Sequence, residues 1–372
     1  MISALFLVAL FLGFEGIVAM ERVPGLRRDE LDPISKGLAE ARIGAHPYLA
    51  YAVRPDLRID PTEDSYFQLS HNSLGFRGPE TTWEKPEGVW RIVCLGGSST
   101  YGFGPTTDAT NWPVRLEARL NARGLPPKVE VINLAAQGYS TFESLIQLAL
   151  RGVDLKPDLV LVYHTINDMR SALYPGVNRD NTHWRAVWPL DRPSVSESLL
   201  EKSGTYRTWR RYATDWVKER GDFGRHVIVD YGRWWPNDFG QPTDMNLGFL
   251  NFERNLKTIV ATARAHGSEV LLVTQAVRLT DFDNADSAQL QRDGFERATQ
   301  ILRQVAERES AHFYDARPPI ESEADRRRAA DGHDGLFTET VHLTDIGCDL
   351  LAAILSRHIV ESQILPIPAA AR

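Results

Sequence analysis

The chain has 372 residues, of which 43% are hydrophobic and 24% are charged, and its formal net charge is -7 at pH 7. This length and composition favour one large globular domain with appendages, and the negative charge without a basic stripe argues against a nucleic-acid partner. The two cysteines, Cys94 and Cys348, both lie in apolar surroundings, which argues against a disulfide scaffold or a thiolate metal site.

The first predicted element is a single-pass transmembrane anchor over residues 1–20. This segment is almost wholly apolar, with Glu15 as its only charge, and is just long enough to cross a bilayer as a helix. A cleaved signal peptide would normally carry Lys or Arg before the apolar run and a small-residue exit, and the sequence has neither. A buried helix or a misplaced start is the alternative. Because Arg22, Arg27 and Arg28 follow the segment, the positive-inside rule alone would keep the rest of the chain in the cytoplasm.

A Pro-rich linker and lead-in over residues 21–88 precede the main domain, which we predict over residues 89–362, with a tail at 363–372. Short apolar or β-branched runs predict five strands, at residues 91–95, 129–134, 158–163, 269–274 and 312–315. Helical patterns lie between and after them, at residues 112–123, 142–150, 249–266, 288–308 and 345–358, the last after a possible Thr344 N-cap. The alternation predicts an α/β fold in which a five-stranded parallel sheet is covered by helices on both faces, a three-layer αβα arrangement.

The stretch 170–248 interrupts this rhythm and is predicted to be a Trp-rich insertion. Six of the nine tryptophans lie in it: Trp184, Trp188, Trp209, Trp216, Trp234 and Trp235. Aromatic side chains could line a substrate groove there, or they could form a packed side layer that touches no substrate.

Four polar segments carry the candidate chemistry. The first predicted strand runs into Gly96-Gly97-Ser98-Ser99-Thr100, where a serine hydroxyl could face a cleft. A phosphate-binding loop is the alternative for such a Gly-rich turn, but the Walker lysine is missing, and the G-x-S-x-G elbow is broken as well. Since ligands of parallel α/β sheets bind beyond the carboxyl ends of the strands, Ser98 is well placed to react.

The next two segments follow the second and third predicted strands. Gly138 could offer a backbone N–H to the same cleft, and Asn167 could direct a side-chain amide at a developing oxyanion. The fourth segment, Glu339-Thr340-Val341-His342-Leu343-Thr344, has a carboxylate three residues before a histidine. This spacing can place the carboxylate on one imidazole nitrogen while the other nitrogen faces a serine.

Taken in order, the G-G-S-S-T, Gly138, I-N-D and E-x-x-H-L-T segments resemble the SGNH (GDSL-like) hydrolase superfamily over roughly residues 47–359. The N-S-L-G-F-R-G segment at 72–78 resembles the lead-in of its membrane-anchored bacterial members. The resemblance implies an SGNH, flavodoxin-like fold with Ser98 as nucleophile and His342 as base. It also implies an oxyanion hole formed by Ser98, Gly138 and Asn167.

Three positions depart from the family pattern. Gly97 replaces the Asp of G-D-S, and Thr165 replaces the Gly of G-x-N-D. Glu339 stands where Asp is usual in D-x-x-H, and its additional methylene changes the reach to the imidazole. We take Glu339 as the acid, with Asp334 or no acid at all as alternatives. Ser99 is interpreted as a turn residue and Asp168 as a carboxylate that braces the loop.

The expected function is a serine ester hydrolase that forms an acyl-enzyme on a short-chain or carbohydrate O-acyl ester and needs no cofactor or metal. The alternatives are an O-acetyltransferase of a cell-surface polysaccharide and an inactive SGNH protein that only binds a glycan or an envelope partner. The resemblance implies a catalytic domain outside the cytoplasmic membrane, against the arginine count after the anchor.

Overall fold

The computed structural model describes residues 43–44, 46, 48–49, 51–60, 68–124, 127–173, 179, 203, 245–279 and 285–364. The chain divides into two compact units, one of residues 1–51 and 185–231 and the other of residues 52–184 and 232–372. The first contains the short strand β1 (Ile43–Gly44). The second contains all four polar segments that carry the predicted chemistry.

A five-stranded parallel sheet forms the centre of the second unit. Its strands, in spatial order, are β6 (Lys128–Asn133), β5 (Val89–Gly96), β7 (Leu159–Tyr163), β8 (Glu269–Val273) and β9 (His312–Tyr314). The register pairs Cys94 with Asn133, Gly96 with Tyr163 and Tyr163 with Val273. Because the second strand of the sheet along the chain lies outside the first, the strand order reverses beside β5, and this switch point is where ligands of such sheets bind.

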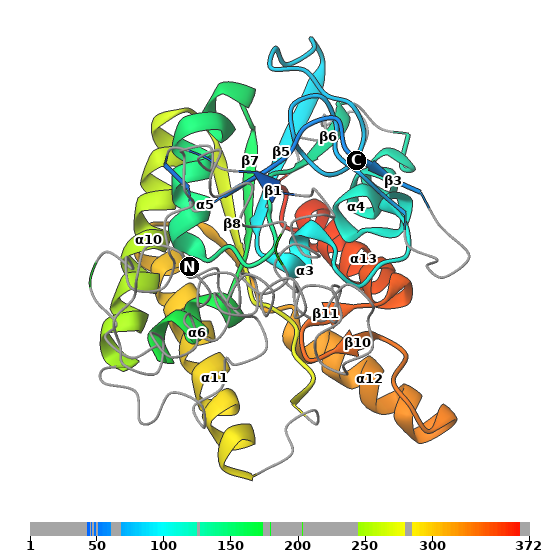
Figure 1. Ribbon diagram of the computed structural model, residues 1–372, viewed down its shortest axis with the longest axis vertical. Coiled ribbons are helices and arrows are strands. Elements are labelled where there is room, and N and C mark those ends of the chain that lie inside the picture. The colour runs from blue at the N-terminus through cyan, green and yellow to red at the C-terminus, as the bar shows by residue number, and fades with distance from the viewer. Residues whose placement is uncertain are drawn as a thin grey trace, which may run out of the picture. The chain divides into compact units, whose positions relative to one another are not determined.

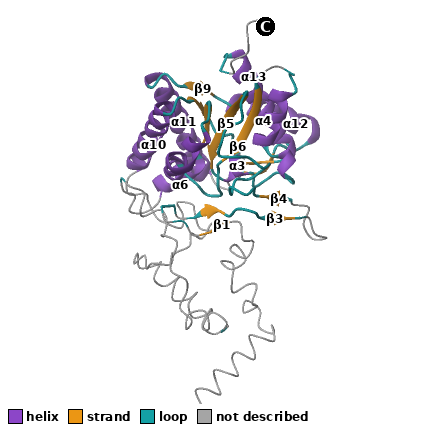
Figure 2. Cartoon of the chain, turned by 90° about the horizontal axis from the view of Figure 1, so that it is seen from above, coloured by secondary structure: helices purple, strands orange, loops and turns teal. Residues whose placement is uncertain are grey.

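Helices cover both faces of this sheet, as Figures 1 and 2 show. On one face lie α5 (Thr141–Gln147), α6 (Ile166–Leu173), α10 (Met245–Ala265) and α11 (Ala285–Arg308). On the other face lie α4 (Trp112–Asn121), α12 (Arg317–Asp331) and α13 (Asp345–Glu361). This is the three-layer αβα arrangement that the alternating sequence predicts.

The core consists of two hydrophobic clusters, one on each face of the sheet. Along β7, Leu159, Leu161 and Tyr163 belong to the cluster of α4 and α13, and the alternate residues Val160 and Val162 belong to the cluster of α10 and α11. Side chains of a strand alternate between faces, so a strand buried on both sides becomes a continuous apolar run. Each fully buried Leu or Val contributes about 1.5 to 3 kcal/mol.

The outer edge of β6 is covered by side chains of α4. Asn121 accepts a hydrogen bond from Val129 N at 2.9 Å and donates to Val129 O at 2.8 Å, and Glu117 accepts from Val131 N at 2.7 Å. Burial raises the pKa of Glu117. An unpaired strand edge can pair with a strand of another chain. These side chains occupy the outer backbone groups of β6 and so prevent such pairing there.

Short elements complete the unit. They are β2 (Ala52–Val53), β3 (Arg58–Ile59), β4 (Leu69–Ser70), α3 (Ser98–Tyr101), the 3₁₀ turns Asp108–Thr110 and Val153–Leu155, the π-turn Leu148–Gly152, β10 (Phe337–Glu339) and β11 (His342–Leu343). Strands β3 and β4 pair antiparallel, as do β10 and β11.

All five predicted strands are present within one or two residues of their expected bounds, and Thr344 caps α13 by accepting from Gly347 N. Among the described helices of eight or more residues, α6 and α12 were not predicted. Helix α12 buries only Ile320 and Ala324, so its sequence lacks an apolar stripe, and α6 lies at the border of the predicted insertion. The predicted helix 142–150 ends at Gln147 and continues as π and 3₁₀ turns.

No helix within the described ranges is both long and apolar enough to span a membrane. The predicted anchor, residues 1–20, lies outside those ranges, as do the six tryptophans of the insertion. Of the insertion's predicted span, the structure assigns residues 170–173 to α6 and residues 245–248 to α10.

Candidate active site

Ser98 is the first residue of α3, directly after the end of β5. The N-cap Gly97 accepts at its carbonyl from Thr100 N and Tyr101 N, and Gly102 ends the helix with a φ of +101°, a left-handed conformation that suits glycine. Ser98 is only 9% exposed. The strand, the sharp turn and the single helical turn therefore fix the hydroxyl at the carboxyl end of the sheet.

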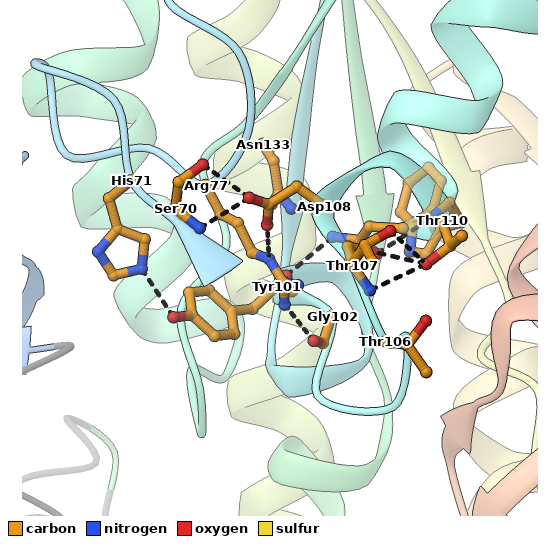
Figure 3. Close-up of polar contacts among 12 residues, drawn as sticks. Ser70, His71, Arg77, Tyr101, Gly102, Thr106, Thr107, Asp108, Thr110 and Asn133 are labelled. Atoms are coloured by element: carbon orange, nitrogen blue, oxygen red, sulfur yellow. Dashed lines mark hydrogen bonds and ion pairs between the residues drawn. The ribbon is translucent and has the colours of Figure 1, made fainter. Parts of the chain in front are cut away.

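Residues of the lead-in support this turn through hydrogen bonds and an ion pair, as Figure 3 shows. The guanidinium of Arg77 donates to the carbonyls of Tyr101 and Gly102, which end α3, and to Asp108 Oδ1 at 2.8 Å. Asp108 also accepts from Ser70 N and Ser70 Oγ at 2.7 and 2.6 Å. The lead-in is thus part of the support of the site.

His342 lies next to Ser98, and its own partner is Glu339. The Nε2 atom of His342 is 2.7 Å from Ser98 Oγ, and its Nδ1 atom is hydrogen-bonded to Glu339 Oε1. The acid and the histidine face each other across the hairpin of β10 and β11, with Thr340 and Val341 at the turn. The two-residue turn of this hairpin therefore brings the glutamate beside the histidine that follows it three positions later.

The carboxylate of this pair is open to solvent. The side chain of Glu339 is 62% exposed, while that of His342 is 13% exposed. The hydrogen bond with His342 lowers the pKa of Glu339, and the positive charges of Arg170 and Arg278 lower it further against partial desolvation. Glu339 is therefore ionised across the neutral range and able to orient an imidazole.

Asp334, the alternative acid, has other partners. It is 5% exposed and accepts from Leu336 N at 2.9 Å and Phe337 N at 3.2 Å. Arg278 and Arg328 lie 3.6 and 3.5 Å from its other oxygen. These backbone hydrogen bonds and cations lower its pKa although burial alone would raise it. Asp334 therefore braces the start of β10.

The predicted oxyanion segments lie beside the nucleophile turn. Asn167 Nδ2 donates to Tyr139 O at 2.8 Å. A Cβ atom added at Gly97 would meet that Nδ2 atom at 2.5 Å and Tyr139 O at 2.9 Å. Gly138 has a φ of +76°, so a turn that favours glycine precedes Tyr139. The three predicted donor residues thus gather around Gly97 and Ser98.

The same contacts explain one departure from the family pattern. Gly97 stands where Asp is usual, and here the space for a Cβ is filled by Asn167 and Tyr139. Any side chain at this position would have to move the amide of Asn167. In this chain, Asn167 can hold its position only because residue 97 is a glycine.

A second cluster of a serine, a histidine and a carboxylate lies nearby, and the sequence analysis did not predict it. Ser144 Oγ is 2.7 Å from His164 Nε2, and His164 Nδ1 is 3.8 Å from Asp168 Oδ2. All three residues are at least 95% buried, and burial lowers the pKa of His164 to about 3. The imidazole is therefore neutral, and its contact with Asp168 is no ion pair.

Asp168 also accepts from Thr141 N at 3.1 Å and from Thr141 Oγ1 at 2.5 Å. It thus links the start of α6 to the start of α5, close to both oxyanion segments.

Ser99 was expected to be a plain turn residue, but its hydroxyl donates to Val341 O and accepts from Gln275. Within the described part of the chain, no group of three or more His, Cys, Asp or Glu residues could hold a metal ion.

Comparisons with known proteins identify the family to which this chain belongs. The model of the GDSL-like lipase/acylhydrolase family matches residues 94–350. A search of curated proteins returned no match. Among solved structures, similar chains include a catalytic mutant of the acetylxylan esterase Axe2 from Geobacillus stearothermophilus, at 15% identity and a TM-score of 0.42, covering 75% of this chain and 96% of that one.

Two other similar structures have TM-scores of 0.44. One is a lipase/acylhydrolase from Enterococcus faecalis, at 16% identity over 75% of this chain and 100% of that one. The other is the acetyl xylan esterase AlAXEase, at 14% identity over 72% of this chain and 99% of that one. The family model, which covers more than half of the chain, decides the assignment: the protein belongs to the GDSL-like lipase/acylhydrolase family and is an SGNH-type ester hydrolase.

Proposed function

We propose that the protein hydrolyses short-chain or carbohydrate O-acyl esters through an acyl-enzyme on Ser98. His342 takes the proton of the Ser98 hydroxyl as its oxygen attacks the ester carbonyl. The imidazolium gives that proton to the departing alkoxide, and water then releases the acyl group by the same route in reverse. The observation that carries the proposal is the continuous hydrogen-bonded series from Ser98 through His342 to Glu339.

The tetrahedral intermediate needs donors for its negative oxygen. We assign this role to Ser98 N, Gly138 N and the side-chain amide of Asn167, which gather around the nucleophile turn. Asn167 uses its amide to hold Tyr139 O, and a primary amide has a second N–H for an oxyanion. Tyr139 thereby fixes the direction in which that second N–H points.

The surroundings of His342 support a sugar as the alcohol part of the ester. Phe103 is 41% exposed, and its ring centroid lies 5.2 Å from that of His342. The exposed carboxylate of Glu339 is hydrogen-bonded to Nδ1 of the same imidazole. An aromatic face next to a carboxylate suits a sugar, which offers both an apolar ring face and hydroxyl groups.

The test measures turnover of activated esters by the full chain. We expect Ser98→Ala to lower kcat by about 10³-fold or more and to abolish labelling by a fluorophosphonate probe. Ser144→Ala is the matched control, because Ser144 also contacts a histidine but is buried in the second cluster. Near wild-type turnover by Ser98→Ala would refute the assignment.

Acyl preference is tested with esters of increasing chain length and with acetylated sugars. We expect acetyl and propionyl esters to be turned over faster than long-chain esters, and acetylated sugars to release acetate. A preference for long-chain esters would refute the proposed substrate class. Acyl groups that appear on an added polysaccharide rather than as free acid would show an acyltransferase.

A further inference from the structure

The segment that follows β8 makes hydrogen bonds to the nucleophile turn, to the start of α6 and to the hairpin of β10 and β11. We propose that Gln275 is a positioning residue that holds the nucleophile turn, the start of α6 and the histidine hairpin in register. This inference rests on the proposed function, since it concerns how Ser98, Asn167 and His342 keep their mutual geometry. The four segments that carry the resemblance do not include Gln275.

One hydrogen-bonded series passes through Gln275. Its Oε1 atom accepts from Ile166 N at 2.8 Å, and its Nε2 atom donates to Ser99 Oγ at 2.8 Å. Ser99 Oγ in turn donates to Val341 O at 2.9 Å. Each contact lies one residue away from a proposed active-site residue, because Ile166 precedes Asn167, Ser99 follows Ser98, and Val341 precedes His342.

The direction of this series is fixed by the chemistry of its members. Ile166 N can only donate, so the amide oxygen of Gln275 must face it and the NH₂ group must face Ser99. The Ser99 hydroxyl has one hydrogen, which goes to Val341 O, so its oxygen is left to accept from Gln275. Reversing the amide would set donor against donor at Ile166, so only one orientation satisfies all partners.

Burial keeps water from replacing any member of the series. Gln275, Ile166 and Val341 are each 3% exposed, and Ser99 is 5% exposed. Unpaired polar groups are costly at such positions, so the three segments keep these separations rather than shift independently. A shift of about 1 Å between reacting groups can cost about 10²-fold in rate, which is what this series prevents.

Backbone contacts of the same segment reinforce it. Arg278 N donates to Thr340 O at 2.7 Å, and Arg278 Nη1 donates to Phe337 O at 3.0 Å, so the hairpin that carries Glu339 and His342 is tied to the end of β8. Ala276 N donates to the hydroxyl of Tyr163, at the end of β7. Gln275 is the one side chain of this segment that reaches the nucleophile turn among the described contacts.

The test replaces Gln275 with methionine, which has a similar length and no hydrogen-bonding amide. Thr274→Val is the matched control: Thr274 is the preceding residue, is 1% exposed, and also makes two side-chain hydrogen bonds, a part-buried one to Asp315 and a buried one from Ala316 N. We expect both variants to lose similar thermal stability. Only Gln275→Met should lower kcat, by about 10- to 100-fold, with little change in KM.

A double-mutant cycle with Ser99→Ala identifies the route. Since both substitutions break the bond between Gln275 and Ser99, the loss of kcat in the variant with both should be clearly smaller than the product of the two single losses. A multiplicative loss in the double variant, or an unchanged kcat in Gln275→Met, would overturn the inference while leaving the role of Ser98 intact. Ser98→Ala, measured in the same series, separates the two: its near wild-type turnover would remove the proposed function itself.

Discussion

The Nε2 atom of His342 lies 2.7 Å from the Oγ atom of Ser98, although 244 positions of sequence separate the two residues. One residue begins a helical turn after the first strand of the sheet, and the other begins the second strand of a hairpin. Their contact is held by the surrounding chain: Ser99, the neighbour of Ser98, donates to Val341, the neighbour of His342. The hydrogen bond between these two neighbours therefore also holds Ser98 and His342 at this separation.

Replacing the acid should separate the two candidate carboxylates. We expect Glu339→Gln to lower kcat by about 10²-fold, because a glutamine amide can donate to Nδ1 of His342 and favour the wrong tautomer. Asp334→Asn should keep kcat within about threefold and lower the free energy of unfolding by about 1 to 2 kcal/mol, since an amide nitrogen would replace the carboxylate oxygen that faces Arg278 and Arg328. Steady-state kinetics and urea unfolding of both variants provide the check. The opposite pattern would make Asp334 the functional acid.

Adding a methyl group at Gly97 should disturb the oxyanion site. We expect Gly97→Ala to lower kcat by about tenfold or more, because the new Cβ would displace the amide of Asn167. In an Asn167→Ala background the same substitution should cost less, since one of the two groups in its way, the Asn167 amide, is already gone and only Tyr139 O remains. Kinetics of the two single variants and the double variant give the comparison. Full additivity of the two losses would contradict this explanation of the glycine.

The lead-in should contribute to stability through Arg77. We expect Arg77→Met to lower the free energy of unfolding by about 3 kcal/mol, because it leaves Asp108 and the carbonyls that end α3 without their buried cation. Arg58→Met is the matched control: Arg58 forms a similar ion pair with Asp60, but the side chains are 71% and 58% exposed, and its loss should cost less than about 1 kcal/mol. Urea unfolding measures both. Equal losses would show that the lead-in is a passive covering.

Stability should depend on pH through His164. Burial lowers the pKa of His164 to about 3, so below its ordinary pKa of about 6.5 the unfolded chain binds a proton that the folded chain does not. The free energy of unfolding therefore decreases as the pH is lowered through that window, by up to about 1.4 kcal/mol per pH unit from this group.

The check compares wild type with His164→Gln, in which the glutamine can still hydrogen-bond to Ser144. Between about pH 7 and about pH 5 the variant should lose about 2 kcal/mol less of its free energy of unfolding than the wild type. Carboxylates and other groups titrate equally in both proteins and cancel. The same pH dependence in both would mean that His164 is protonated in the folded state.

Local patterns explain why the fold was predictable. The strands of a doubly covered parallel sheet are short apolar runs, and β7, with the sequence L-V-L-V-Y, is buried along its whole length. The first three polar segments lie at the carboxyl ends of such strands, so the strand assignments alone bring Ser98, Gly138 and Asn167 to one edge of the sheet. Helix α12 escaped prediction because its surface is mostly charged and its anchor to the core is two side chains.

The sequence by itself predicted the five strands in their order along the chain, the position of Ser98 at the end of the first strand, and Glu339 as the preferred acid for His342, with Asp334 or no acid as alternatives. Only the tertiary structure decided which distant segments support them: Arg77 behind α3, Asn167 in the space above Gly97, and Gln275 between Ser99 and Ile166. The physical reason is that periodicity and turn chemistry are local properties of the chain. A hydrogen bond between residues 109 or 176 positions apart, such as those of Gln275 with Ile166 and Ser99, leaves no pattern in either segment.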